Sequence, residues 1–356
     1  MRKSRGFTML ELLIAAALGL LLIAALVQLL AGSSRGNAEL SGQARLQESA
    51  RHAVAILSRS ARNAGYLGCG GRGQLVNGLN GEWRRIAEFD LSRPVEGFDG
   101  SGEGWSPSLD VLPTDGGAGL AFAGNRIDPG RLRTGSDVVV FRRLEAPGWP
   151  LARQLSTAAD AVTLGSEDPL VAVDDRFALE ADDFVAVSDC RQSALFRIGA
   201  VTTIGRAATL GRAAQSGPFG NRAGQLLSSG DQPYGDGSGP AGATVARIVT
   251  QIYFIARGAG ANNRGGAVWS LWRKSGADRP VELVQGVEDL QVLFGVDLSP
   301  DDDIDAPHRY VRANGIAGGA VRAVHFVATV SSVDVVTSDE RVLRRGFAWT
   351  VALRNG

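Results

Sequence analysis

The chain contains few of the residues on which many kinds of site depend. It has two cysteines and three histidines among 356 residues. Two cysteines are too few for a disulfide-dense scaffold or a zinc site with four cysteine ligands, so at most one disulfide can form within the chain. A surplus of positive charge is also missing, since 37 Lys and Arg residues balance 37 Asp and Glu residues. Because binding to nucleic acid requires basic residues that neutralise phosphates, we expect no nucleic-acid partner.

The remaining composition is that of a folded protein with long loops. Hydrophobic residues make up 44% of the chain and charged residues 21%, which argues against disorder. The length allows two or three domains, or one elaborate domain. The 47 glycines are roughly twice the usual share and follow no collagen-like period. We therefore expect long glycine-rich loops.

The longest apolar segment lies near the amino terminus, at residues 7–31. It contains one charged residue, Glu11, and one amide, Gln28. As a helix it would be about 37 Å long, enough to cross a hydrocarbon core of about 30 Å with some tilt. Three basic residues precede it (Arg2, Lys3 and Arg5) and predict a cytoplasmic amino terminus. A secretory signal peptide is the alternative, but its apolar region has only about 7 to 15 residues.

Glu11 is the unusual residue of this segment. A carboxylate inside a membrane helix costs a few kcal/mol unless a cation pairs with it. No Lys, Arg or His lies between Phe7 and Gln28. If the chain were cut between Gly6 and Phe7, the new amine would lie one helical turn from Glu11. A staggered neighbouring subunit could then offer its own amine to this carboxylate.

The arrangement Gly6-Phe7-Thr8-Met9-Leu10-Glu11 after a basic leader resembles the class III signal of type IV pilins and type II secretion pseudopilins. This resemblance implies that a prepilin peptidase cuts after Gly6 and methylates the new terminus at Phe7. It also implies that Glu11 guides the docking of subunits.

Four later segments are similar to the PilW family of minor pilins, namely residues 45–69, 185–190, 286–297 and 344–355. The resemblance implies an α+β, pilin-like fold in which a long amino-terminal helix packs on an antiparallel, β-rich head. It implies no cofactor, a place in the inner membrane and then in the pilus, and the priming of pilus assembly near the tip, in support of adhesion or twitching motility. The implied partners are the prepilin peptidase, other minor pilins, the major pilin, the inner-membrane assembly platform and the membrane itself. A J-like pseudopilin of type II secretion is the alternative, and a membrane-tethered periplasmic enzyme is a less favoured one.

The pattern divides the chain into a leader at residues 1–6, a transmembrane helix at 7–31, an amphipathic continuation at 32–66 and a head at 67–356. Poor helix formers at residues 32–36 predict a kink or a loosened turn. Beyond it, apolar or small residues recur mostly every three or four positions, which predicts one buried helix face ending before Gly65. This expected stripe comprises Leu40, Ala44, Ala50, Ala53, Val54, Leu57, Ala61 and Ala64.

The head has the pattern of a β-rich structure. Alternating or β-branched runs predict seven strands, at residues 137–141, 184–187, 245–256, 268–272, 290–296, 321–330 and 347–353. Glycine-rich segments at about residues 97–135 and 211–243 are expected to be long loops or a subdomain insertion.

The two cysteines, Cys69 and Cys190, would lie beyond the inner membrane, where thiols are oxidised. We therefore expect a disulfide that closes a loop of roughly 120 residues and contributes about 4 to 5 kcal/mol in the chain-entropy model. Two unpaired buried thiols are the alternative.

An acidic run provides the only weak metal candidates. Asp301, Asp303 and Asp305 present oxygens at alternate positions, as in the first half of a calcium loop. The sixth position is Ala306 instead of Gly, and the twelfth is Arg312 instead of Glu. A solvated acidic loop is therefore the favoured interpretation, and calcium binding the weaker one.

Motifs typical of enzymes are missing from the sequence. It contains no H-E-x-x-H helix, and its match to the letters G-x-S-x-G, residues 32–36, lies in the predicted long helix instead of at the strand-to-helix turn of a nucleophile elbow. Residues 68–73 formally match the dinucleotide motif G-x-G-x-x-G, but a predicted helix precedes them where that motif requires a strand. We expect a protein that is not an enzyme.

Overall fold

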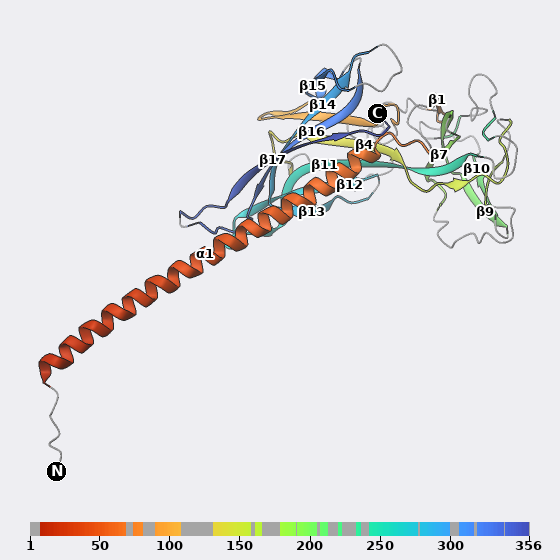
Figure 1. Ribbon diagram of the computed structural model, residues 1–356. Coiled ribbons are helices and arrows are strands. Elements are labelled where there is room, and N and C mark those ends of the chain that lie inside the picture. Colours follow the sequence, from red (N-terminus) through yellow and green to blue (C-terminus); the bar gives the residue numbers. More distant parts are fainter. Residues whose placement is uncertain are drawn as a thin grey trace.

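The protein is described by a computed structural model over residues 8–68, 74–80, 90–107, 131–157, 161–165, 179–189, 191–204, 207–212, 220–222, 233–235, 242–276, 278–299, 306–316, 319–337 and 339–355. These residues form one long helix and a strand-rich head (Figure 1). The α+β, pilin-like fold expected from the sequence is confirmed.

Helix α1 (Met9–Asn63) is uninterrupted. Its last residue precedes Ala64 and Gly65, and Gly65 has a φ of +76°, a conformation that glycine adopts without strain. The Gly65 N–H donates to the Arg142 carbonyl at 2.9 Å, and this hydrogen bond ties the end of the helix to the head. The kink expected at residues 32–36 is wrong, because the helix continues through them and shows no sharp bend (Figure 1).

The strands form three sheets. They are β1 (Gln74–Asn77), β2 (Val95–Ser101), β3 (Gly104–Ser106), β4 (Val138–Leu144), β5 (Trp149–Pro150), β6 (Val162–Leu164), β7 (Phe184–Ser188), β8 (Gln192–Arg197), β9 (Ala200–Ile204), β10 (Ala207–Gly211), β11 (Thr244–Ala261), β12 (Ala267–Ser275), β13 (Val281–Gln285), β14 (Val287–Asp297), β15 (Arg309–Val311), β16 (Ala320–Ser331) and β17 (Arg344–Ala352). The largest sheet has the order β1-β8-β7-β11-β4-β2-β3, with β12 on β11, β13 on β12 and β5 on β11. The others have the orders β15-β14-β16-β17 and β6-β10-β9. Every described pairing is antiparallel except that of β1 with β8.

Each of the seven runs predicted as strands coincides with a strand of the head. The first segment expected to be a loop, residues 97–135, is partly wrong because β2 and β3 lie in its first third. Much of the second, residues 211–243, lies outside the described residues.

The main hydrophobic core lies where the second half of α1 meets the two larger sheets. Phe141 of β4, Tyr253 of β11 and Phe326 of β16 pack there with the buried face of the helix. That face comprises Leu46, Ala50, Ala53, Leu57, Ala61 and Ala64. The predicted stripe is therefore correct from Ala50 onward except at Val54, which is only half-buried. Leu40 and Ala44 are exposed instead, and Gly42 and Leu46 take the buried positions before Ala50.

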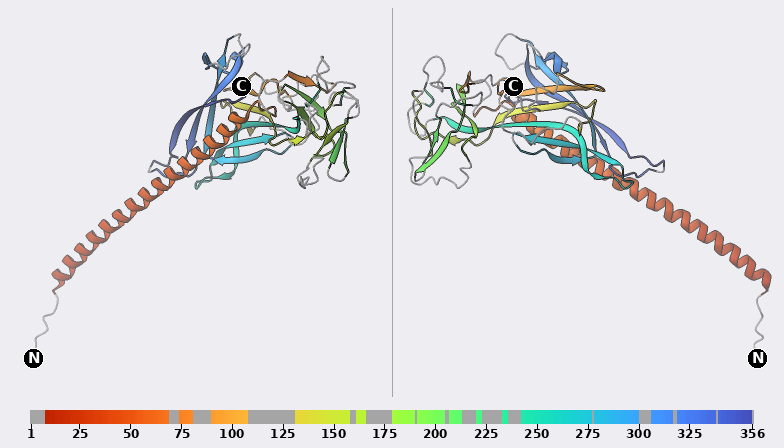
Figure 2. Two further views of the ribbon diagram at one scale, coloured as in Figure 1. Left: turned by 45° about the vertical axis from the view of Figure 1, so that its right-hand side comes forward. Right: turned by 180° about the vertical axis from the view of Figure 1, so that it is seen from behind.

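Strand β11 connects this region to a second part of the head. Its first residues pair with β7, its middle with β4 and its later residues with β12. Strands β1 and β5 to β10, which we call the distal lobe, surround a separate core that includes Val185, Phe196 and Tyr234. Figures 1 and 2 show this lobe at the end of the molecule opposite to the amino terminus, beyond the end of α1.

Candidate functional site

The first half of α1 presents an apolar surface in every direction. Large hydrophobic side chains between Met9 and Leu30 are each more than half exposed, for example Leu12 at 64%. This part of the helix is long and apolar enough to cross a membrane, and the head covers none of it. Because a helix that is hydrophobic all round is stable only in apolar surroundings, this surface requires lipid or other helices. Figure 2 shows it projecting from the head.

Glu11 lies at the very start of this apolar surface. The Thr8 N–H and the Thr8 hydroxyl each donate to Glu11 Oε2 at 3.1 Å, and the Glu11 N–H donates to Thr8 Oγ1 at 3.3 Å. This reciprocal capping directs the carboxylate towards the beginning of the helix. Among the described residues, no cation forms an ion pair with it. The two residues of the expected cleavage site, Gly6 and Phe7, lie outside the described residues.

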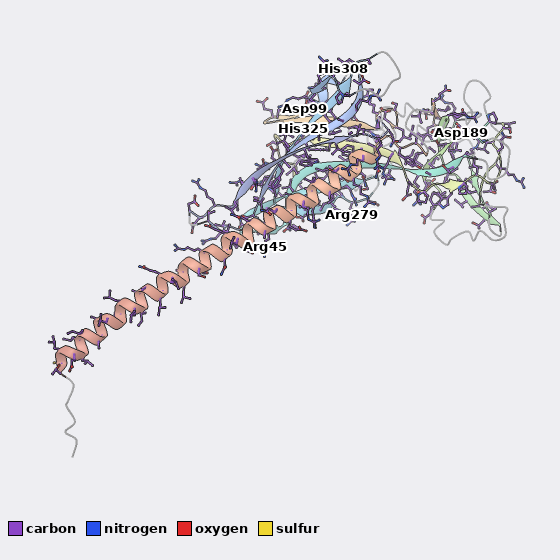
Figure 3. The ribbon with its side chains drawn as sticks, viewed as in Figure 1. Arg45, Asp99, Asp189, Arg279, His308 and His325 are labelled. Atoms are coloured by element: carbon purple, nitrogen blue, oxygen red, sulfur yellow. The ribbon has the colours of Figure 1, made fainter. Side chains whose placement is uncertain are left out.

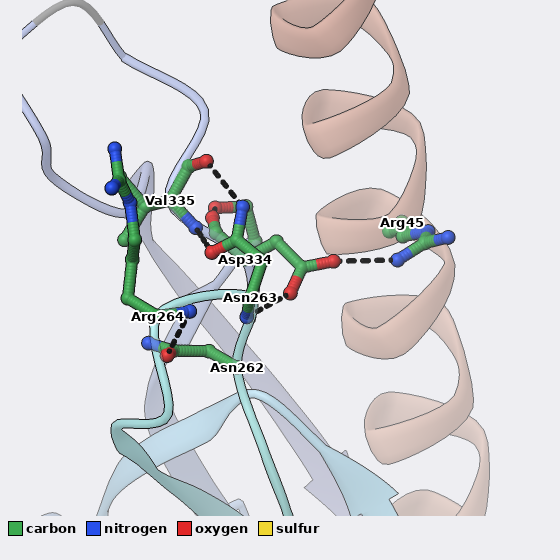
Figure 4. Close-up of polar contacts among 7 residues, drawn as sticks. Arg45, Asn262, Asn263, Arg264, Asp334 and Val335 are labelled. Carbon is green, nitrogen blue, oxygen red and sulfur yellow. Dashed lines mark hydrogen bonds and ion pairs between the residues drawn. The ribbon is translucent and has the colours of Figure 1, made fainter.

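The helix leaves the head at a junction formed by three elements. Arg45 of α1 donates to Asp334 at 2.9 Å, and the other Asp334 oxygen accepts the Asn263 N–H at 2.9 Å. Asn263 also exchanges two hydrogen bonds of 2.9 Å with the backbone of Val335. Figure 4 shows how the β11–β12 turn and the β16–β17 loop meet beside the helix. We call Gly42, Arg45, Asn263, Asp334 and Val336 the helix–head junction.

Steric fit, more than charge, holds this junction. Arg45 is 65% exposed, and an ion pair so accessible to water contributes at most about 1 kcal/mol. At Gly42, by contrast, there is no room for a side chain, because a Cβ built on it would lie 2.9 Å from a methyl group of Val336. Only a residue without a side chain lets the β16–β17 loop approach the helix this closely. Sequence reasoning did not find the contact between Arg45 and Asp334, because 289 positions separate the two residues.

Inside the head, Asp137 joins two sheets. Its carboxylate accepts the Gly100 N–H of β2 and the Val292 N–H of β14, both at 2.7 Å. Burial raises the pKa of Asp137 to about 6, although these two hydrogen bonds act in the opposite direction. The neighbouring Ser136 exchanges hydrogen bonds with the backbone of Leu290. Sequence analysis placed Asp137 only at the start of a strand, since nothing local marks it as a link between sheets.

Asp297, at the end of β14, precedes the acidic run. One of its oxygens accepts two hydrogen bonds from Arg322 at 2.9 and 3.0 Å, and the other accepts the Ser299 N–H at 2.9 Å. His308 approaches it at 3.2 Å. The Ser299 N–H and the Arg322 guanidinium lower the pKa of Asp297 to about 2. Both oxygens are thus engaged by protein groups.

The metal candidates Asp301, Asp303 and Asp305 lie outside the described residues, so calcium binding there stays a prediction. Within the described part of the chain, no group of three or more His, Cys, Asp or Glu side chains is placed to hold a metal ion. Figure 3 shows His308 and His325 on the β14–β17 side of the head and Asp189 in the distal lobe.

The cysteines also lie outside the described residues, but the chain segments that precede them touch. The Ser188 hydroxyl donates to the Leu67 carbonyl. A Cβ built on Gly68 would lie 3.1 Å from the Cβ of Ser188. The chain therefore reaches the positions just before Cys69 and just before Cys190 at neighbouring points of the head.

The geometry at Gly42 predicts that Gly42→Leu lowers the free energy of unfolding by about 1 to 3 kcal/mol, because the added side chain overpacks the contact with Val336. The control is Gly36→Leu, since nothing lies within 4 Å of a Cβ at Gly36. That change should leave stability the same or raise it slightly, because leucine favours the helix. Denaturant unfolding of the detergent-solubilised chain measures both. Equal effects of the two substitutions would contradict a close contact at Gly42.

The raised pKa of Asp137 predicts a pH dependence of stability. Between about pH 4 and pH 6, the folded chain holds a proton on Asp137 that the unfolded chain has lost, so this group's contribution to stability falls as pH rises. The loss across this window is at most roughly 3 kcal/mol. Asp137→Asn should remove this slope, which unfolding curves at a series of pH values would measure. Parallel pH profiles of the two chains would rule out the burial of this carboxylate.

Two family models match parts of the chain. Residues 252–336 match the model for type IV pilus-assembly protein W, and residues 1–27 match the prokaryotic N-terminal methylation motif. The first match covers the later part of β11 and continues through β16 into the loop of the helix–head junction. The second covers the capped start of α1 with Glu11. Comparison with curated proteins and with solved structures finds no match.

Proposed function

We propose that this chain, a pilin of the PilW family by its two model matches, is a minor pilin that primes type IV pilus assembly and is incorporated at or near the pilus tip. The observation that carries the proposal is the exposed apolar half of α1 with a single carboxylate at its start. Such a surface suits storage in a membrane and later packing against other helices. Pilin domains are structural rather than catalytic, which fits the expectation that the chain is not an enzyme.

In this proposal the chain divides into the leader 1–6, the membrane helix 7–31, its continuation 32–66 and the head 67–356. The amino terminus is cytoplasmic, and the head lies on the far side of the inner membrane. The prepilin peptidase cuts between Gly6 and Phe7 and methylates the amine of Phe7. The Glu11 carboxylate then pairs with the amine of a neighbouring subunit. The direction of this carboxylate towards Thr8, the residue after Phe7, supports this pairing.

The shape of the head supports a place near the tip. The distal lobe extends past the end of α1, on the side away from the membrane segment (Figure 1). A lobe in this position would crowd the next layer of a regular shaft, whereas at a tip it would face solvent and serve adhesion or twitching motility. The partners are other minor pilins, the major pilin and the inner-membrane assembly platform. The match to a pilus-assembly family favours this function over a secretion pseudopilin.

The proposal predicts that Glu11→Ala abolishes incorporation into filaments while leaving the unfolding of the head unchanged. Glu39→Ala is the matched control, because Glu39 is an acidic residue of the same helix beyond the apolar segment. Immunoblots of sheared filaments measure incorporation, and mass spectrometry of the recovered chain identifies its terminus. Mature protein that starts anywhere other than at a methylated Phe7, or normal incorporation of the Glu11→Ala chain, would overturn the proposal.

We further propose a disulfide between Cys69 and Cys190, supported by the contact of Ser188 with Leu67. Alkylation of the native chain without a reductant should leave its mass unchanged, whereas alkylation after reduction should add two groups. Reduction, or the double substitution to Ser, should lower stability by about 2 to 5 kcal/mol. Two thiols that react in the native, unreduced chain once it is denatured would refute the bridge.

A further inference from the structure

A polar slot opens between the two larger sheets, next to the helix–head junction. Its volume is about 200 Å³. Arg133 and Trp269 line it from the sheet that contains β11 and β12, and Glu288, Ser331 and Arg344 line it from the sheet that contains β14, β16 and β17. Asn262, in the β11–β12 turn, lies at one end. We call this cavity the Trp269 slot.

Two guanidinium groups lie over the Trp269 ring. The Arg133 guanidinium carbon is 5.1 Å from the ring centroid, and that of Arg257 is 5.7 Å away. Arg257 is the cross-strand neighbour of Trp269, and Arg133 follows the bridge between Leu132 and Ala256. The Trp269 ring attracts both cations, and this attraction holds each guanidinium beside it.

The other charges of the slot are already balanced. Arg344 donates to Glu288 at 2.7 Å, so these two groups largely offset each other. Nearby, Arg45 is paired with Asp334 and Arg264 with Glu340. By contrast, neither Arg133 nor Arg257 forms an ion pair with any acidic residue in the described parts of the chain. Arg133 in the slot, and Arg257, which contacts Trp269 from outside the slot lining, therefore have no counterion among the described residues.

We propose that the Trp269 slot binds a carboxylate side chain of a neighbouring pilin subunit. A carboxylate can accept two parallel hydrogen bonds from one guanidinium, and in the slot it would provide a counterion for Arg133 and for the nearby Arg257. Glu288 does not prevent this, because Arg344 offsets its charge. The preference for a carboxylate follows from the geometry alone. That the carboxylate belongs to another subunit rests on the proposed function.

The position of the slot argues against a lipid phosphate as the occupant. The slot lies at the level of the helix–head junction, since Asn262 borders the slot and the adjacent Asn263 bonds to Asp334. Arg45 of this junction follows the last residue of the apolar segment, Ala31, by 14 helical positions, which corresponds to about 20 Å. In the proposed topology, this distance places the slot well above the headgroups of the membrane that holds the helix.

The binding test uses the full chain in detergent and isothermal titration calorimetry. The probes are N-acetylglutamic acid methylamide, its glutamine counterpart and inorganic phosphate. We expect the acid to bind at least about tenfold more tightly than the amide and more tightly than phosphate. The double variant Arg133→Gln/Arg257→Gln should lose this preference. Arg279→Gln is the matched control, because Arg279 is an exposed arginine of the β12–β13 turn (Figure 3) and should keep it.

Unfolding curves of the Arg133→Gln/Arg257→Gln chain and the Arg279→Gln chain establish that each is folded. Arg257→Gln alone, at an exposed position, is a milder change that should weaken the preference for the acid over the amide. Equal binding of acid and amide, or tighter binding of phosphate, would overturn the inference. If the double variant lost acid binding but entered filaments at the level of the Arg279→Gln chain, the neighbouring subunit would be excluded as the source. These outcomes are separate from the Glu11 experiment, because the titration requires no assembly.

Discussion

The close contact between the second half of α1 and two sheets is the constraint on which the rest of the structure depends. The buried face of the helix contains mainly alanine, with Leu46 and Leu57 as its large residues. Small side chains allow strands of both sheets to approach the helix backbone, and aromatic residues such as Phe141 and Phe326 fill the remaining space. Gly42 ends this contact, and residues before it have no covering from the head. The second half of the helix thus contributes to the hydrophobic core of the head, whereas its first half presents an exposed apolar surface.

Local patterns made much of this architecture predictable. The membrane segment, the strand runs and the stop at Gly65 each depend on residues close together in the chain, so they are visible in the sequence. The kink expected near Gly32 and Gly36 was wrong because an exposed glycine costs only about 1 kcal/mol within a helix that continues on both sides. The stripe was assigned wrongly at its start because Gly42 does not count as apolar, although its lack of a side chain is what buries it.

The contacts that define the candidate sites were beyond the reach of such patterns. Arg45 and Asp334, or the two arginines over Trp269, come from segments that only the fold brings together. Asp137 resembles any acidic residue before a strand until the donors Gly100 and Val292 are placed around it. By contrast, Glu11 could be singled out from the sequence, because it is the one charged residue within an uncharged run.

Strand β11 has a consequence for how the molecule bears load. It is one continuous chain segment of 18 residues, bonded to β7 at one end and to β4 and β12 further along. A pull on the outer end of the head is therefore transmitted in part along this strand. Antiparallel hydrogen bonds lie across that direction, so many of them resist the pull together instead of opening one after another. Strand β11 is thus suited to carry tension between the distal lobe and the part of the head that packs on the helix.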